Sequence, residues 1–148
     1  MDATNLIRVL ADHFPLPFVM TGPDLSAPGP IILHVNPAFE RMAGYPASEL
    51  IGRSPRMLQG PRTSLPVRRQ LLHALTRGQR FHGTLTNYRK SGESYLCEID
   101  VRPVFNAAGQ IEAFVAFERE VIRRRGRPSS RGRFVAVEGM GMGGVFGE

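Results

Sequence analysis

The sequence predicts an α+β domain in which helices cover one face of a single antiparallel sheet. Three observations support this fold class. Two short strand-like segments come first, over residues 18–22 and 31–36, an amphipathic helix follows over 63–79, and three longer strand-like segments come after it. Strands at both ends of a chain with helices between them are typical of this class. If all five strands join one sheet, the helices must enclose a space against one of its faces.

The N-terminal segment predicts a short amphipathic helix over residues 1–14, which Pro15 ends. Its apolar stripe recurs at helical spacing and consists of Leu6, Val9, Leu10 and Phe14. After the two short strands, Asn36 is expected to cap a second helix, because a proline follows it at the first helical position. That helix is expected to stop at Gly44, and a further short turn follows over 46–52.

The helix over 63–79 carries one apolar stripe, which consists of Val67, Leu71, Ala74 and Leu75. Gly78 supplies its expected C-terminal stop. Three strands are expected next, over 80–90, 94–105 and 111–121, because the segments KSGES and NAAGQ between them are typical of hairpin turns. Alternation places one set of residues on the inner face of the sheet, namely Phe81, Gly83, Leu85, Asn87, Tyr95, Cys97, Ile99 and Val101.

The composition bounds the class of protein. The chain has 148 residues, enough for one domain with a substantial core. It contains no apolar run near the ~20 residues that a membrane-spanning helix needs, and no secretory pattern at its N-terminus. The single cysteine excludes an internal disulfide and a multi-cysteine zinc site, and it indicates a reducing compartment. We therefore expect a cytoplasmic protein.

The positive charge is concentrated near the C-terminus. The formal net charge is +6, and residues 119–148 carry seven arginines against three glutamates. Residues 123–148 are first basic and then glycine-rich, which predicts a disordered tail in which 133–137 could form an isolated strand. A basic tail can contact nucleic acid or acidic lipid. We interpret this one as a solvated linker and do not expect nucleic-acid binding.

The pattern does not favour an enzyme. The four histidines are scattered along the chain, and none lies beside a nucleophile with a supporting acid. No glycine motif for binding phosphate or a dinucleotide is present. We therefore expect no catalytic residues and no metal site. A haem sensor is disfavoured because no histidine falls on the apolar side of the long helix.

Two segments of the chain resemble a PAS domain of the light-oxygen-voltage (LOV) branch. They are HVNPAFERMAGYPASELIGRSPRMLQGPRT and NYRKSGESYLCEIDVRPVFNAAGQIEAFVAFEREV, and the match spans residues 15–122. The resemblance implies the PAS fold, with a five-stranded antiparallel sheet, helices over one face and a ligand pocket between them. PAS domains act as sensors that bind a small molecule or a partner. The LOV branch comprises flavin-binding blue-light sensors.

The resemblance also implies roles for the loop GRSPRMLQGPRT over residues 52–63. LOV photochemistry needs a cysteine in this loop, whose thiol adds to the flavin under blue light, and this chain has Pro55 there. The family's preceding asparagine is Ser54. The arginine that faces the flavin phosphate is retained as Arg56, and the glutamine of LQ is retained as Gln59. Arginines in one exposed loop can equally form only a solvated surface.

Further contacts implied by the resemblance lie on the long helix and the sheet. A second phosphate-facing arginine would fall at Leu72 and is lost, although two arginines lie one turn earlier. The asparagine of NY is retained as Asn87. A second ring-facing asparagine is replaced by Cys97, and the glutamine of the final strand is replaced by Glu118. The candidate ligand contacts are therefore Ser54, Arg56, Gln59, Asn87, Cys97 and Glu118.

The orientation of the last strand decides what Glu118 does. Alternation puts Glu118 on one face and Val115 and Phe117 on the other. If Glu118 points inward, burial raises its pKa and it needs a donor or a ligand, with Gln59 and Asn87 as available partners. Alternatively, the strand is turned over and Glu118 is solvated. Since both faces are apolar, a third possibility is that one face is core and the other a dimer surface.

The sequence leaves two functions in competition. The favoured hypothesis is a PAS sensor or interaction module without a cysteinyl photoadduct, whose pocket is empty, filled by side chains or occupied by a small ligand. The alternative is an FMN-binding, LOV-like photoreceptor that signals by flavin reduction. Structural alternatives exist for the contacts, since Gln59 and Asn87 could join loop backbone to sheet and Cys97 could be a small buried hydrophobe. Either module would act as a homodimer through Val115 and Phe117 or on an effector protein.

Overall fold

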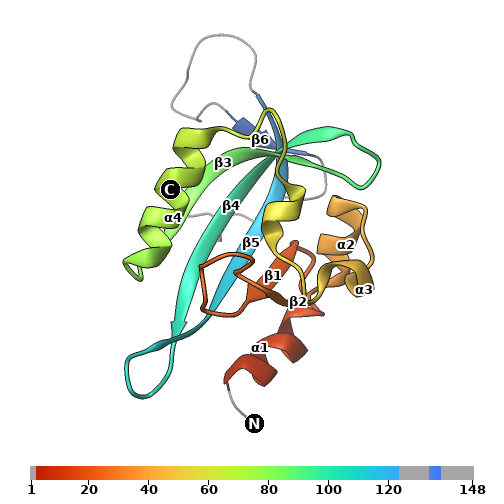
Figure 1. The fold of residues 1–148 in the computed structure, drawn as a ribbon. Coiled ribbons are helices and arrows are strands. Elements are labelled where there is room, and N and C mark those ends of the chain that lie inside the picture. Colours follow the sequence, from red (N-terminus) through yellow and green to blue (C-terminus); the bar gives the residue numbers. More distant parts are fainter. Residues whose placement is uncertain (1–2, 124–133, 138–148) are drawn as a thin grey trace.

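The computed structural model describes residues 3–123 and 134–137. Its elements follow one another as α1 (Ala3–Ala11), β1 (Phe18–Thr21), β2 (Ile32–Val35), α2 (Pro37–Ala43), α3 (Ala47–Leu50), the 3-10 helix η1 (Pro55–Leu58), α4 (Leu65–Thr76), β3 (Phe81–Tyr88), β4 (Ser94–Phe105), β5 (Ile111–Arg123) and β6 (Phe134–Ala136). The main sheet has the strand order β2-β1-β5-β4-β3 with antiparallel pairing (Figure 1). The predicted α+β class with a five-stranded antiparallel sheet is confirmed.

Asn36 joins three elements at the start of α2. Its side-chain oxygen accepts the backbone N–H groups of Phe39, at 3.0 Å, and Phe18, at 2.9 Å. Its side-chain nitrogen donates to the carbonyl oxygens of Ala11 and Leu16. Asn36 is fully buried, so each of these bonds satisfies a backbone group that water cannot reach. The predicted N-cap is therefore also the junction between α1, β1 and α2.

α2 and α4 begin and end close to the residues that the sequence indicates, whereas α1 ends at Ala11, before the predicted end at residue 14. α2 stops at Gly44, whose φ of 77° is readily adopted only by glycine. The hydroxyl of Ser64 caps α4 by accepting the N–H of Val67. Leu75 of α4 is buried, and the rest of the predicted stripe packs partly buried against the same core. This packing fixes α4 across the inner face of the sheet.

The sheet has a hydrophobic core on each side. The larger core lies between the sheet and α2, α3, η1 and α4, and the inner-facing residues of β4 belong to it as predicted. The smaller core lies on the outer face, where Ala11 and Ile7 of α1 pack with Phe18 of β1. In Figure 1, α1 lies beside β1 and β2, away from α4. The helices therefore do not all cover one face.

The side of α1 that contacts the sheet differs from the predicted stripe. Leu6, Val9 and Leu10 are each about half exposed, at 51%, 52% and 50%. Ala11 is buried instead, and Ile7 packs against the outer core. Three of the four residues of the predicted stripe are therefore left about half exposed, whereas Phe14 packs against Phe117 of the same domain.

Val115 and Phe117 lie on the outer face, opposite Glu118, as the alternation of β5 predicts. They are partly buried, however, because α1 of the same chain packs over this region. The ring of Phe117 meets those of Phe14 and Phe18 edge to face, with centroids 5.8 and 5.5 Å apart. A dimer contact made directly by Val115 and Phe117 would therefore compete with α1.

Most of the segment expected to be a tail lies outside the described residues. Residues 124–133 and 138–148, which include the arginine cluster and the glycine-rich end, belong to this part. Between these two ranges, the described residues Phe134–Ala136 form β6, which pairs antiparallel with the end of β5. The strand considered for 133–137 is therefore present, and it is not isolated because β5 supplies its hydrogen bonds. Two further elements are also confirmed. The strands expected over 18–22 and 31–36 are present as β1 and β2, which pair with each other, and the turn expected over 46–52 is present as α3.

Candidate ligand pocket

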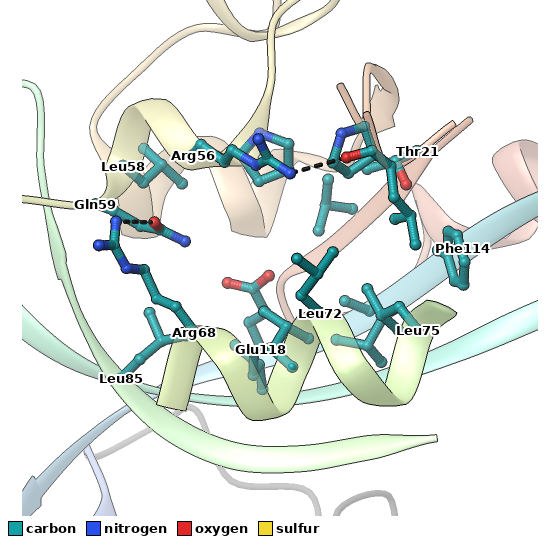
Figure 2. A pocket seen from close by; sticks show the side chains of 18 of the residues that line it. Thr21, Arg56, Leu58, Gln59, Arg68, Leu72, Leu75, Leu85, Phe114 and Glu118 are labelled. Carbon is teal, nitrogen blue, oxygen red and sulfur yellow. Dashed lines mark hydrogen bonds between the residues drawn. The ribbon is translucent and has the colours of Figure 1, made fainter. Parts of the chain in front are cut away.

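A cavity of about 350 Å³ lies between the inner face of the sheet and the helices η1 and α4. Its walls are mainly apolar, with Leu58 from η1, Leu75 from α4, Leu85 from β3 and Phe114 from β5 among them (Figure 2). The volume falls within the range of small-molecule sites, roughly 300–1,000 Å³. The side chains of the domain thus leave room that a small ligand can occupy.

Glu118 projects from β5 into this cavity. Figure 2 shows its carboxyl group in the space between α4 and the loop that carries Arg56 and Gln59. The residue is buried, with 7% of its surface exposed, and burial raises the pKa of the carboxyl from its ordinary 4.5 to about 7. No cation of the described residues lies within ion-pair distance of it. The inward orientation considered from the sequence is therefore the one observed.

The partner of Glu118 is Cys97, not Gln59 or Asn87. The Cys97 thiol donates to Oε1 of Glu118 across a distance of 3.2 Å. Cys97 is completely buried, and both this burial and the neighbouring carboxyl raise the pKa of its thiol well above the ordinary value. The thiol is therefore protonated and serves as a hydrogen-bond donor beneath the cavity floor.

Two amide side chains, those of Asn87 and Gln59, line the cavity. Asn87 comes from β3, where it pairs with Tyr95 of β4, and it is buried. Gln59 follows η1 and is half-buried. Its side-chain oxygen accepts a hydrogen bond of 3.2 Å from Arg68, so that its amide N–H groups stay available. Both residues can therefore offer donors to a ligand.

Three arginines surround the mouth of the cavity. Arg56 of η1 donates to the backbone oxygen of Leu25 in the β1–β2 connection, at 2.9 Å. Arg68 and Arg69 project from the first turns of α4, and all three guanidinium groups are exposed. The cavity therefore combines an uncompensated acid at depth with positive charge at its opening.

The loop over 52–63 is held against β3 by contacts that need glycine. A Cβ atom at Gly60 would overlap the ring of Tyr88, and the Tyr88 hydroxyl accepts the N–H of Arg62 at 3.0 Å. The Thr63 hydroxyl donates to the backbone oxygen of Thr86 at 2.6 Å. These bonds fix η1, and with it Arg56 and Gln59, over the sheet.

Four of the six predicted contact residues line the cavity, namely Arg56, Gln59, Asn87 and Glu118. Ser54 does not, because its hydroxyl is used to cap η1 by accepting the N–H of Arg56. Cys97 is adjacent to the cavity but lies below its wall. The prediction missed Arg68 as a partner of Gln59, although its position one turn before Leu72 was a usable signal.

Comparison with known proteins identifies the family. A model described as "PAS domain" matches residues 17–121, which is most of the chain. The chain belongs to the PAS domain family. Within this family the chain is LOV-like. The LOV domain of the Erythrobacter litoralis EL346 blue-light activated histidine kinase is 27% identical to it. The two structures match with a TM-score of 0.67, over 73% of this chain and 97% of that one. A LOV domain studied with a flavin analogue is 26% identical, with a TM-score of 0.71 over 82% and 87% of the two chains.

Curated relatives of this PAS domain are much longer proteins. A blue-light-activated histidine kinase of Brucella canis is 34% identical over 120 residues, which is 81% of this chain and 24% of the relative. A nitrogen fixation regulatory protein of Klebsiella oxytoca is 34% identical over 90 residues, which is 61% of this chain and 18% of the relative. The chain thus spans at most about a quarter of these relatives.

Two further findings concern the described part of the PAS domain. Its side chains include no group of three or more histidine, cysteine, aspartate or glutamate residues placed to hold a metal ion. None of the helices in residues 3–123 has the length and apolar character needed to cross a membrane.

Proposed function

We propose that this PAS domain is a sensory module that binds a flavin such as FMN and works without a cysteinyl photoadduct. The observation that carries the proposal is the cavity, which is roomy, mainly apolar, acidic at depth and lined by arginines at its mouth. A flavin mononucleotide has matching parts, since its ring system is flat and largely apolar and its phosphate is anionic. The similarity to LOV domains supports the same ligand class.

Different residues of the chain would bind the phosphate and the ring system of the flavin. Arg56 and Arg68 would hold the phosphate, because guanidinium groups form charge-assisted bonds to phosphate oxygens. The amides of Gln59 and Asn87 would meet polar edges of the ring, and Glu118 would meet it at the deep end. When bound, FMN supplies blue-light absorption and electron acceptance. The domain would then report light or redox state to an output partner.

Pro55 excludes the formation of a thiol adduct at its position in the pocket. It lies on the cavity wall where the LOV resemblance places the reactive cysteine, and its ring carries no nucleophile. The only thiol of the chain, Cys97, is buried below the wall and bonded to Glu118. We therefore expect signalling by light-driven reduction of the flavin, with electrons from an external donor such as a cellular thiol or a reduced nicotinamide, rather than by thiol addition. No enzymatic step is proposed for this domain.

An absorption experiment with a matched variant tests this function. The 148-residue chain, purified with excess FMN and then desalted, should be yellow with a structured flavin band in the blue. Blue light without an electron donor should leave that band unchanged in the wild type, whereas Pro55→Cys should bleach reversibly because a thiol now faces the cavity. A colourless wild type that also fails to retain added FMN would contradict flavin binding. Reversible bleaching of the wild type without a donor would contradict the adduct-free mechanism.

The output contact is proposed to be a second copy of the chain or an effector protein. The sequence pointed to Val115 and Phe117 for this contact, but α1 occupies that region. We place the contact on the outer side of α1, whose exposed Leu6, Val9 and Leu10 continue the same apolar surface outward. The similarity to a histidine kinase does not assign a kinase output to this chain, because only 24% of that relative is matched.

A further inference from the structure

We propose that ligand binding in this pocket is coupled to proton uptake by Glu118, so that the pocket holds a flavin ring only with this carboxyl in its neutral form. The inference rests on the proposed flavin function and adds a regulation to it. The resemblance places glutamine, a group that cannot titrate, at this position of the last strand, and this chain has an acid there. The affinity of the pocket for a flavin would therefore depend on pH.

The geometry around Glu118 favours the neutral form. The side chain is buried and points into a mainly apolar cavity, and its oxygen Oε1 accepts only the Cys97 thiol. A weak thiol donor stabilises a buried carboxylate poorly compared with a guanidinium or backbone N–H group. Its second oxygen, Oε2, accepts no protein hydrogen bond in the described residues. When protonated, the carboxyl can donate to a ligand acceptor, such as a ring nitrogen or carbonyl oxygen.

The charged and titratable groups on the surrounding elements do not supply a counter-ion. On β4 the neighbours are Cys97 and Tyr95, and burial raises the pKa of both above their ordinary values, so both are neutral. On β5, Glu120 is the next acidic side chain along, and it is paired with Arg89. β3 and β1 contribute Asn87, Val19 and Thr21 to the wall, none of which titrates.

The arginines at the mouth are the remaining cations, and two of them are bound to other groups. Arg56 donates to the Leu25 carbonyl, and Arg68 donates to Gln59. Arg69 is exposed on α4 and makes no ion pair with Glu118. An anionic ligand tail would bind these arginines at the mouth and not bring them to Glu118. Ligand binding thus removes water from Glu118 without bringing a positive charge to it.

The direction of the effect follows from this arrangement. Below about pH 7 the carboxyl of the empty pocket is already neutral, and binding needs no proton. Above about pH 7 it is ionised, and a flavin ring must displace its hydration, so the group takes up a proton as the ligand enters. The affinity should then fall by up to tenfold for each further pH unit, by proton linkage.

Riboflavin is the probe that isolates Glu118. FMN carries a phosphate that itself titrates near pH 6, at about the pH of interest, whereas riboflavin has none. The dissociation constant of riboflavin would be measured by fluorescence quenching between pH 6 and 9 for the full chain and for Glu118→Gln. Calorimetry at pH 8.5 in two buffers of different ionisation enthalpy would count the protons taken up by the wild type.

The results separate the two proposals. The inference predicts constant affinity for the wild type up to about pH 7, weakening toward tenfold per unit above it, nearly one proton taken up at pH 8.5, and no pH dependence for Glu118→Gln. If riboflavin binds but the wild type takes up no proton, the coupling is wrong and the flavin function stands. If neither riboflavin nor FMN binds at pH 6, both proposals are overturned. Because the proton count uses the wild type, it remains decisive even if the variant folds poorly.

Discussion

The unliganded protein offers a direct thermodynamic test of the buried acid. Glu118 has a pKa raised from 4.5 to about 7 in the folded state, whereas in the unfolded chain it is solvated. The folded state therefore holds this proton more tightly, and the stabilisation that results is complete below pH 4.5 and lost as the pH rises through about 7. At about 1.4 kcal/mol for each pKa unit, the total is about 3 kcal/mol.

The matched variant Glu118→Gln separates this effect from every other titration. Asp100, for example, is buried yet has a lowered pKa, because its bonds to Arg80 and Arg102 outweigh the desolvation that opposes them. Its contribution declines at acidic pH, but it does so equally in both proteins and cancels in their difference. The difference between wild type and variant should thus report Glu118 alone.

Urea unfolding at intervals between pH 5 and 8 would provide the measurement. We expect the unfolding free energy of the wild type to fall, relative to that of Glu118→Gln, by most of about 3 kcal/mol over this range. A difference that stays constant within error from pH 5 to 8 would refute the reasoning, because it would mean that Glu118 titrates alike in the folded and unfolded states.

The remaining predictions concern the scaffold and the contact surface. Asn36→Ala should cost about 3 kcal/mol in urea unfolding, because it leaves four buried backbone partners unsatisfied; a loss below 1 kcal/mol would show that water replaces them. Gly60→Ala should weaken FMN binding and cost about 1–3 kcal/mol, because the added methyl group overlaps Tyr88; unchanged affinity would contradict the role given to this loop. Leu6→Glu with Leu10→Glu should convert a dimer to a monomer in light-scattering measurements, and an unchanged mass would exclude α1 as the contact.

Two control substitutions belong with those predictions. Gly22→Ala adds a methyl group where nothing lies within 4 Å, so that it should alter neither stability nor binding measurably. Ile51→Glu places a charge on another exposed apolar residue, 46% exposed, that lies outside α1. It should leave the mass of the particle unchanged. If Ile51→Glu also dissociates the dimer, the effect of the α1 substitutions reflects charge rather than the contact surface.

Local pattern was sufficient to predict the sheet. The alternation of β4 places Cys97 on the inner face because a strand has a strict period of two. The alternation of β5 separates Glu118 from Val115 and Phe117, but only the structure decides that Glu118 is the residue that faces inward. Capping residues such as Asn36 also mark their helices reliably, since their preference arises from bonds to the following turn. These features depend on neighbours within a few residues along the chain, which the sequence displays directly.

Features that depend on distant neighbours were harder to predict. The amphipathic pattern of α1 revealed a stripe, but it could not tell whether Leu6 and Leu10 face this sheet or another surface. The bond between Cys97 and Glu118 depends on the register of β4 and β5, in which Ile99 stands opposite Glu118. The pairing of Arg68 with residues of the loop requires the position of α4 over the sheet. Register and helix placement are tertiary properties, so residue type alone does not fix them.

Blocking the cavity tests the central claim most directly. Ala116 lies on the cavity wall, and Ala116→Phe would fill the space that a ligand ring needs while keeping an apolar residue on β5. Calorimetric titration with FMN at pH 6 should give one site per chain in the wild type and at least a hundredfold weaker binding in Ala116→Phe, with both proteins folded by circular dichroism. Equal binding by the two proteins, or no binding by the wild type, would contradict a ligand site between the helices and the sheet.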